Sequence, residues 1–185
     1  MATVLAVAAC AVAVVLALWS ARAASRLRAA ERLATTDPLT GLANRRQLER
    51  VLCAEGARAV RTGGDLCVAF VDLDGFKAVN DRTGHRSGDT VLVTVAAAWS
   101  AALRPYDLLA RHGGDEFVVV LPDCTPGGAC RVVDRLRSTA PEVTGVSAGV
   151  TAWRVGDDPV AVLDRADTAL RRAKAAGGGR TELAD

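Results

Sequence analysis

Two apolar runs separated by a short glycine-rich segment limit most strongly how this chain can fold. Residues 108–110 and 118–121 flank the segment Arg111-His112-Gly113-Gly114-Asp115-Glu116-Phe117. Apolar runs on either side of a turn that contains glycine predict a β-hairpin. Gly113 and Gly114 accept positive φ and leave the backbone bare, so a charged ligand such as a phosphate chain can approach it closely.

Two adjacent carboxylates, Asp115 and Glu116, follow the glycines at the tip of this predicted hairpin. Adjacent negative charges repel each other unless positive charge lies near them, and a divalent metal ion is the obvious counter-charge. Gly, Asp and Glu are also ordinary turn residues, so a solvated turn is the alternative interpretation. The hairpin alone leaves both interpretations open.

A second acidic segment follows a continuous apolar run at residues 66–71, which predicts a buried central strand. The run ends in Asp72-Leu73-Asp74, where sheet proteins commonly build sites. If this strand lies beside the hairpin, Asp72 and Asp115 can face each other. Two carboxylates and a backbone carbonyl are ligands that Mg²⁺ accepts when it also holds phosphates. We expect Asp74 to cap the following helix instead.

The polar segment 80–89 is predicted to be a turn before a helix at residues 90–103. Asn80 and Asp89 can hydrogen-bond a base, and a carboxylate suits the N–H groups of guanine. Both residue types also populate turns without any ligand, and the same holds for His85. Lys77 offers a point charge that suits a phosphate, although a solvated lysine is the alternative.

The remaining pattern predicts helices at residues 45–61, 126–138 and 159–176 and a strand at 143–153. The hairpin together with crossover helices predicts an α/β (α+β) domain, a mixed central sheet flanked by helices. With 23 Lys and Arg against 21 Asp and Glu, nothing in the charge balance favours nucleic acid as a partner. The five cysteines lack metal-ligand spacing and are typical of buried, reduced thiols.

Residues 2–20 contain no charged side chain, and this length is close to the ~20 residues that cross a bilayer as a helix. We therefore predict a transmembrane helix at 1–20, a helical linker at 21–35 and a domain at 36–185. The arginines after the apolar segment predict that the domain faces the cytoplasm. A cleaved signal peptide is the competing interpretation. Two linker helices could also pair, but the repeat is too short to establish a coiled coil.

Several segments together resemble the GGDEF-domain diguanylate cyclases. In chain order they are Asp37-Pro38-Leu39-Thr40-Gly41-Leu42-Ala43-Asn44-Arg45-Arg46, Asp72-Leu73-Asp74-Gly75-Phe76-Lys77-Ala78-Val79-Asn80-Asp81, Gly84-His85-Arg86-Ser87-Gly88-Asp89 and Arg111 to Phe117. The last carries the Gly-Gly-Asp-Glu-Phe motif unaltered. The resemblance runs from about residue 36 to residue 177, and several motifs in order are far more specific than one.

The resemblance implies a fold shared with nucleotidyl cyclases, close to a ferredoxin-like core. It implies that two GTP molecules condense to cyclic di-GMP with release of two pyrophosphates. Each domain would hold one GTP, so a homodimer would be needed for catalysis. With the apolar segment, it implies an enzyme held in a bacterial inner membrane through one span, with its C-terminal domain in the cytoplasm.

The family's site residues map onto this chain by position. Mg²⁺ (or Mn²⁺) would be bound by Asp72, the Leu73 carbonyl and Asp115, and either Asp115 or Glu116 would remove the 3′-hydroxyl proton. The residues implied to bind GTP are Lys77, Asn80, His85, Asp89, Gly113, Gly114 and Lys174. Arg104 and Asp107 form an Arg-x-x-Asp that resembles the family's inhibitory site for the product. A partner arginine there would be Arg135 or Arg137.

The C-terminal end departs from the family pattern. Gly177-Gly178-Gly179-Arg180 stands where a Gly-Arg-Asn-like end is usual, so the phosphate-binding arginine is either shifted to Arg180 or lost. This departure motivates a second hypothesis, a non-catalytic cyclic di-GMP receptor that uses Arg104 and Asp107. A third hypothesis, an adenylyl-type cyclase of similar fold, is disfavoured by the guanine-binding pair Asn80 and Asp89.

Overall fold

The structure is a computed structural model that describes residues 19, 35–141 and 145–184. The predicted transmembrane helix (1–20) and linker (21–35) lie outside these residues except for Trp19 and Thr35, so both stay predictions. In the described part, no helix is long and apolar enough to span a bilayer. The described residues from Thr36 onward form a compact unit of their own.

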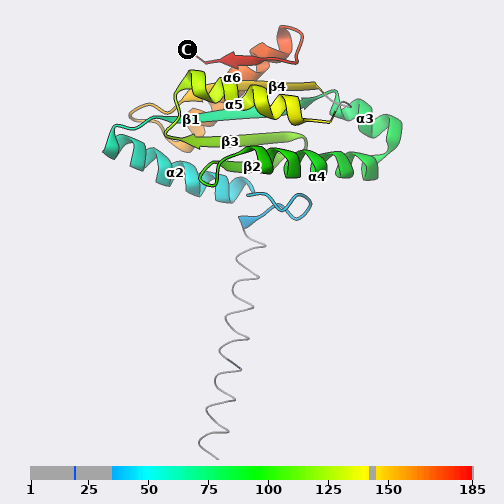
Figure 1. Cartoon of the computed structure of the whole chain (residues 1–185), viewed down its shortest axis with the longest axis horizontal. Helices are drawn as coiled ribbons and strands as arrows, with labels where there is room; N and C mark the ends of the chain where they lie inside the picture. The colour runs from blue at the N-terminus through cyan, green and yellow to red at the C-terminus, as the bar shows by residue number, and fades with distance from the viewer. Residues whose placement is uncertain (1–18, 20–34, 142–144, 185) are drawn as a thin grey trace, which may run out of the picture. The chain divides into compact units, whose positions relative to one another are not determined.

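A five-stranded mixed sheet is the centre of this unit (Figure 1). Its strands are β1 (Leu66–Asp74), β2 (Leu108–Gly113), β3 (Glu116–Pro122), β4 (Gly145–Ala152) and β5 (Thr181–Leu183), in the order β2-β3-β1-β4-β5. β1 is antiparallel to both β3 and β4, and β5 is parallel to β4. This confirms the hairpin, the central strand and the mixed sheet. With β1 between β3 and β4, the core has the ferredoxin-like arrangement.

The helices begin and end close to the predicted boundaries, with one exception. They are α2 (Arg45–Thr62), α3 (Phe76–Thr83), α4 (His85–Ala102), α5 (Pro126–Thr139) and α6 (Pro159–Ala175). The predicted polar turn at 80–89 is wrong, because Asn80 lies in α3 and Asp89 in α4. A single residue, Gly84 with φ of 83°, separates α3 from α4. Glycine reaches this φ without strain, so the break needs no longer turn.

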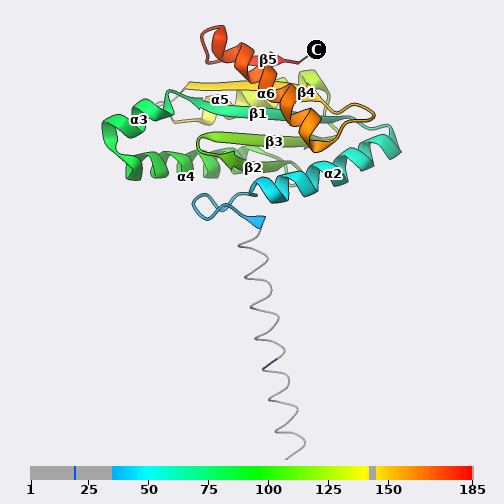
Figure 2. The ribbon, with the colours of Figure 1, turned by 180° about the vertical axis from the view of Figure 1, so that it is seen from behind.

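The sheet is covered on both faces, and alternate residues of β1 enter two separate cores. Val71 and Leu73 pack in the core under α4 and α5. Val68 and Phe70 pack in the core under α2 and α6. Figure 1 shows α4 and α5 in front of the sheet, and Figure 2, from behind, shows α2 and α6. The end of β1 therefore lies between two packed layers, where its side chains are held firmly.

Candidate active site

The sheet brings the two predicted acidic segments together at one end. Asp72 of β1 lies opposite Glu116 of β3 in the antiparallel register. The Leu73 backbone N–H donates to the Asp115 carbonyl oxygen at 3.4 Å. The condition under which Asp72 and Asp115 can face each other, a strand that lies beside the hairpin, is thus met. This proximity arises because β3 pairs directly with β1 and places the hairpin turn beside residues 72 and 73.

Asp72 is a buried carboxylate, with 5% of its surface exposed. Burial raises the pKa of Asp72, and the neighbouring negative charges of Asp115 and Asp74 add to the rise. The Lys174 ammonium lies 2.7 Å from Asp72 Oδ2 and acts in the opposite direction without cancelling the effect of burial. Lys174 stands near the end of α6, so α6 supplies the counter-charge to the end of β1.

The donors at this end of the sheet suit a hard divalent cation. The Asp115 backbone contacts Leu73, and the charge of the Asp115 carboxylate acts on the Asp72 carboxylate. Mg²⁺ and Mn²⁺ prefer oxygen ligands of this kind. Across the described residues, no three His, Cys, Asp or Glu side chains gather as a metal site. A cation here would therefore depend on the backbone carbonyl and on ligand oxygens as well as on the two carboxylates.

Asp74 does not cap α3, and the prediction that it does is wrong. The N-cap of α3 is Gly75, which makes no side-chain hydrogen bond to the helix. The Asp74 carboxylate instead accepts hydrogen bonds from the Ser147 hydroxyl at 2.7 and 2.9 Å and from the Gly179 N–H at 2.9 Å. Asp74 thus joins the ends of β1 and β4 to the glycine turn after α6.

Asn80 and Asp89 come from two helices that meet closely at Gly88. A Cβ atom on Gly88 would lie 1.9 Å from Asn80 Oδ1, so a larger residue at position 88 would displace the Asn80 amide. Asn80 is half-buried there, and Asp89 is exposed on the next residue of α4. Lys77 and His85 are both exposed, in the first turns of α3 and α4 respectively.

Arg111 holds the turn of the hairpin, a role that the sequence analysis did not assign. Its Nε and Nη2 donate to the Gly114 carbonyl oxygen at 2.9 and 2.8 Å. Its Nη1 donates to both Asp37 carboxylate oxygens, at 3.1 and 3.2 Å. Gly114 has φ of 53°, which favours glycine. The bare glycine turn is therefore clamped by one guanidinium.

Asp37 connects the segment before α2 to this clamp. Burial by itself raises the pKa of Asp37, but hydrogen bonds from Thr40 and Arg111 outweigh it and leave that pKa below its usual range. Asp37 therefore stays charged at neutral pH. Asp37 and Thr40 stabilise a turn before α2, and Arg111 connects that turn to the glycine-rich hairpin. Their place in the chain, far before the hairpin, gave no sign of this contact.

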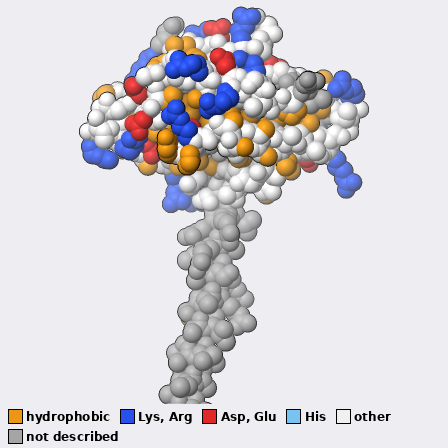
Figure 3. All heavy atoms as spheres, viewed as in Figure 1, with side chains coloured by type: hydrophobic (Ala, Val, Ile, Leu, Met, Phe, Trp, Pro, Cys, Tyr) orange, Lys and Arg blue, Asp and Glu red, His pale blue; other side chains and the backbone are white. Residues whose placement is uncertain are grey.

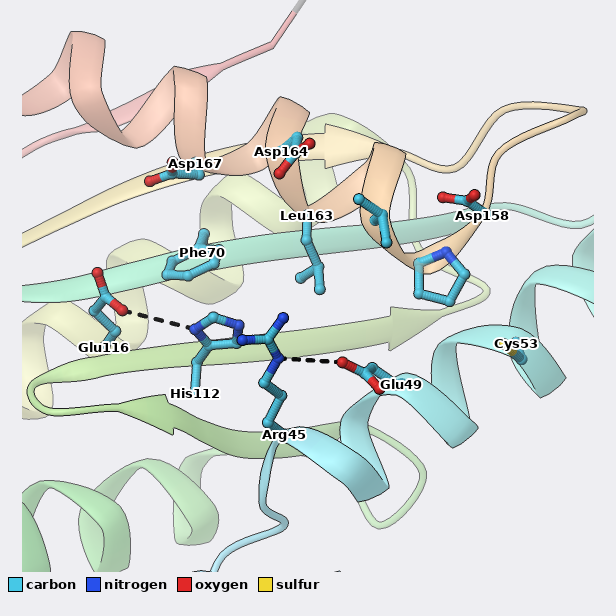
Figure 4. A pocket seen from close by; sticks show the side chains of 12 residues that line it. Arg45, Glu49, Cys53, Phe70, His112, Glu116, Asp158, Leu163, Asp164 and Asp167 are labelled. Carbon is cyan, nitrogen blue, oxygen red and sulfur yellow. Dashed lines mark hydrogen bonds and ion pairs between the residues drawn. The ribbon is translucent and has the colours of Figure 1, made fainter.

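A groove of about 470 Å³ lies between α2 and α6 beside the hairpin (Figure 4). Phe70 of β1 lies in its floor, with the His112 ring edge-on at a centroid distance of 5.0 Å. His112 Nδ1 is 3.6 Å from Glu116 Oε2, so Glu116 is directed toward this groove. Arg45 approaches from α2, and Asp164 lies on the α6 side. Asp115 and Glu116, the two carboxylates of the Gly-Gly-Asp-Glu-Phe motif, thus lie in different surroundings.

Arg104 and Asp107 form a tight turn at the end of α4. Asp107 Oδ2 accepts from the Arg104 backbone N–H at 2.9 Å, and the Arg104 side chain is exposed. Of the two candidate partner arginines on α5, Arg137 contacts the Val146 carbonyl oxygen and Thr181, whereas Arg135 is exposed. Figure 3 shows basic side chains gathered over α5 on this face.

Comparison with known proteins places this geometry in a family. The family described as "Diguanylate cyclase, GGDEF domain" matches residues 34–180. The chain is 43% identical over 170 residues to diguanylate cyclase DgcP of Pseudomonas aeruginosa, covering 86% of this chain and 25% of DgcP. It is 39% identical over 158 residues to response regulator PleD of Caulobacter vibrioides, covering 78% of this chain and 35% of PleD.

A solved structure of similar fold contains the coiled coil and GGDEF domain of DgcB from Caulobacter crescentus in complex with c-di-GMP. It superposes with a TM-score of 0.85 at 30% identity, covering 90% of this chain and 94% of that chain. The chain spans about a quarter to a third of the length of the curated relatives DgcP and PleD. The similarity therefore concerns only part of each of these two curated relatives.

Proposed function

This chain belongs to the GGDEF-domain diguanylate cyclase family, and from that premise we propose that it condenses two GTP molecules into cyclic di-GMP and two pyrophosphates. One observation carries the proposal. The buried Asp72 carboxylate, the Asp115 turn and the Lys174 ammonium converge at one end of the sheet, 2.7 Å separating Lys174 Nζ from Asp72 Oδ2. Negative and positive groups so placed suit a metal-bound triphosphate.

Each residue then has a defined task in the proposed reaction. Asp72, Asp115 and the Leu73 carbonyl would hold Mg²⁺. The bound ion would neutralise charge that develops on the phosphates. The bare Gly113-Gly114 backbone would lie against the phosphates, and Lys77 would attract them. Positioning of the reacting groups would supply much of the remaining rate enhancement.

Base recognition is proposed for the junction of α3 and α4. The Asn80 amide would donate and accept hydrogen bonds along the guanine edge, and the Asp89 carboxylate would accept hydrogen bonds from guanine N–H groups. His85, the first residue of α4, would lie near the nucleoside. The contact between Asn80 and Gly88 supports this assignment, because it orients the amide before any ligand arrives.

Glu116 is proposed to remove the 3′-hydroxyl proton. Glu116 points toward the groove beside His112, whereas the negative charge of Asp115 acts on Asp72 in the proposed metal set. Glu116→Gln should then reduce turnover while leaving Mn²⁺ binding intact, and Asp115→Asn should weaken Mn²⁺ binding. Mn²⁺ binding followed by electron paramagnetic resonance distinguishes the two variants. Loss of metal binding in Glu116→Gln would overturn the assignment.

The wider setting of the enzyme is part of the same proposal. Each domain would hold one GTP, so two copies would meet face to face for catalysis. Cyclic di-GMP would inhibit by binding at Arg104 and Asp107, with Arg135 as the partner arginine, because Arg137 is engaged with β4 and β5. An apolar helix at 1–20 would hold the enzyme in a bacterial inner membrane, with the domain in the cytoplasm.

The first test is incubation of the purified chain with GTP and Mg²⁺ over a range of protein concentrations, with the products followed by chromatography. We expect cyclic di-GMP to form, and Asp72→Asn to abolish its formation. ATP should neither replace GTP nor compete with it, because Asn80 and Asp89 suit guanine. Binding of cyclic di-GMP without any turnover of GTP would instead establish the non-catalytic receptor.

A further inference from the structure

We propose that Lys174 is an internal competitor of the divalent metal: its ammonium neutralises Asp72 until the triphosphate of GTP draws it away. This inference rests on the proposed function only for the identity of the nucleotide. Metal and nucleotide would then bind with strong positive coupling, and the metal alone would bind weakly. When metal and nucleotide bind together, the metal would replace the Lys174 ammonium as the counter-ion of the buried Asp72 carboxylate.

The burial of Asp72 makes a counter-charge necessary in the metal-free protein. A carboxylate with 5% of its surface exposed loses most of its hydration, and Asp115 and Asp74 add negative charge nearby. The Lys174 ammonium at 2.7 Å from Asp72 Oδ2 supplies the compensating charge. A second cation on the same carboxylate would face direct repulsion from that ammonium.

The two partners differ in freedom of movement. The Asp72 side chain is 7% exposed, and it stands on the central strand of the sheet. The Lys174 side chain is 43% exposed at the last turn of α6. A lysine stem has four flexible methylene groups, so its ammonium can move to a nearby anion while Asp72 stays in place. The phosphates of a nucleotide provide such an anion, and a metal ion by itself does not.

The test compares Mn²⁺ binding to the full chain with and without nucleotide, followed by the resonance signal of free Mn²⁺. A sample of nucleotide without protein corrects for the Mn²⁺ that the triphosphate binds by itself. The nucleotide is a GTP analogue with a methylene group between the α- and β-phosphates, from which pyrophosphate cannot leave. Without nucleotide, Lys174→Met should bind Mn²⁺ at least about tenfold more tightly than the unaltered chain, a coupling of ordinary size. Lys174→Arg keeps the charge and should bind Mn²⁺ as weakly as the unaltered chain.

The matched control is Arg171→Met, which removes the same charge from the same helix. Arg171 pairs with Asp167 on the surface and is 71% exposed, so its loss should leave Mn²⁺ binding unchanged. Circular dichroism and thermal unfolding establish that each variant is folded. With the analogue present, the unaltered chain should gain Mn²⁺ affinity by at least about tenfold, and Lys174→Met should gain much less.

Two results would overturn the proposal. Lys174→Met that binds Mn²⁺ no more tightly than the unaltered chain would show that the ammonium does not compete with the metal. If the analogue does not change the Mn²⁺ affinity of the unaltered chain, nucleotide does not release Lys174. This second result needs no variant, so it holds even if Lys174→Met fails to fold. Neither readout requires turnover, so an active cyclase without this competition remains distinguishable from a chain that is no cyclase.

Discussion

At the scale of single residues, the site depends on side chains that contact residues far away in the sequence. Asp74 accepts hydrogen bonds from Ser147 and Gly179, and Arg111 joins Gly114 to Asp37. In each case hydrogen bonds within the protein satisfy a charged group. Substitutions that weaken these hydrogen bonds should therefore lower activity more than they lower the stability of the fold.

The contact between Gly88 and Asn80 gives the sharpest prediction at this scale. Gly88→Ala should raise the KM for GTP, because a Cβ atom 1.9 Å from Asn80 Oδ1 must displace the amide. Overpacking costs about 1–3 kcal/mol, but the displaced atom ends a side chain, and alanine is favoured over glycine inside a helix by about 0.5–1 kcal/mol, so the net loss of stability in chemical unfolding should stay below about 2 kcal/mol. In an Asn80→Ala background the overpacking disappears, so Gly88→Ala should raise stability. The same change in stability in both backgrounds would contradict the proposed contact.

Asp37 gives a second prediction, which concerns the clamp on the hairpin. Asp37→Asn should lower kcat by about tenfold, because one neutral amide cannot hold the Arg111 guanidinium through two charge-assisted hydrogen bonds. Asn80 and Asp89 are on other elements, so the affinity for the GTP analogue should change little. Asp123→Asn, which removes an exposed partner of Arg58, is the matched control and should leave kcat unchanged. A selective loss of GTP affinity would argue against a clamp.

At the scale of elements, the packing of α6 on the sheet determines where Lys174 lies. A Cβ atom on Gly149 of β4 would lie 2.0 Å from the Ala166 carbonyl oxygen, so strand and helix touch through their backbones. Arg165 of α6 donates to Thr151 and Ala152 of β4 and to Asp157 of the connecting loop. The middle of α6 is thereby anchored on β4, and Lys174 lies near the C-terminal end of the helix.

The pair of Asp157 and Arg165 predicts a pH dependence of stability. The hydrogen bonds from Arg165 lower the pKa of Asp157 from its usual 3.8, and burial only partly opposes them. The ion pair therefore stabilises the fold above pH 3.8, and this contribution is lost as the pH falls through the lower folded pKa. Asp157→Asn should cost about 2–3 kcal/mol at neutral pH.

The measurement is the free energy of unfolding of Asp157→Asn and of the unaltered chain, at pH 7 and in increasingly acidic buffers. The difference should shrink as the acid protonates Asp157. Asp134→Asn, which removes an exposed partner of Arg137, serves as control and should cost far less at neutral pH. A difference that persists unchanged in acid would show that the charge of Asp157 is not what stabilises the loop.

At the scale of the whole molecule, the described domain is one half of the proposed catalytic unit. In the proposed reaction two copies would have to meet, so the rate per molecule should rise with protein concentration and then level off as dimers form. Residues 36–185 form a compact unit with two cores of their own and should fold without the preceding segment. The preceding apolar segment and linker would raise the local concentration of domains.

We therefore expect removal of residues 1–35 to shift the dependence of the reaction rate on protein concentration, with little change in the stability of the domain. The shortened chain should need more protein to reach the same rate of cyclic di-GMP formation per molecule. Its thermal unfolding should match that of the domain in the full chain. Arg104→Ala in both forms removes the proposed product inhibition, so that accumulated product does not distort the comparison. Identical concentration dependence would assign dimerisation to the domain alone.

Much of this protein follows from local sequence pattern. The apolar runs around Gly113 and Gly114 are sufficient to predict the hairpin, and the run before Asp72 predicts the central strand, because burial and turn chemistry act over a few residues. The ends of α2, α5 and α6 also agree with the predictions within two residues. The order of the motifs is likewise sufficient to predict that Asp72 and Asp115 belong to one metal site.

Tertiary structure alone decided which charged groups meet. Asp74 resembles a helix cap in sequence, yet Ser147 and Gly179 hold it. Asp37 meets Arg111 across 74 positions of sequence, and Lys174 reaches Asp72 from the last turn of α6. The short strand β5 likewise forms only because β4 offers it an edge. Local propensity cannot encode such pairs, because they arise when sheet register and helix packing bring distant charges out of water together.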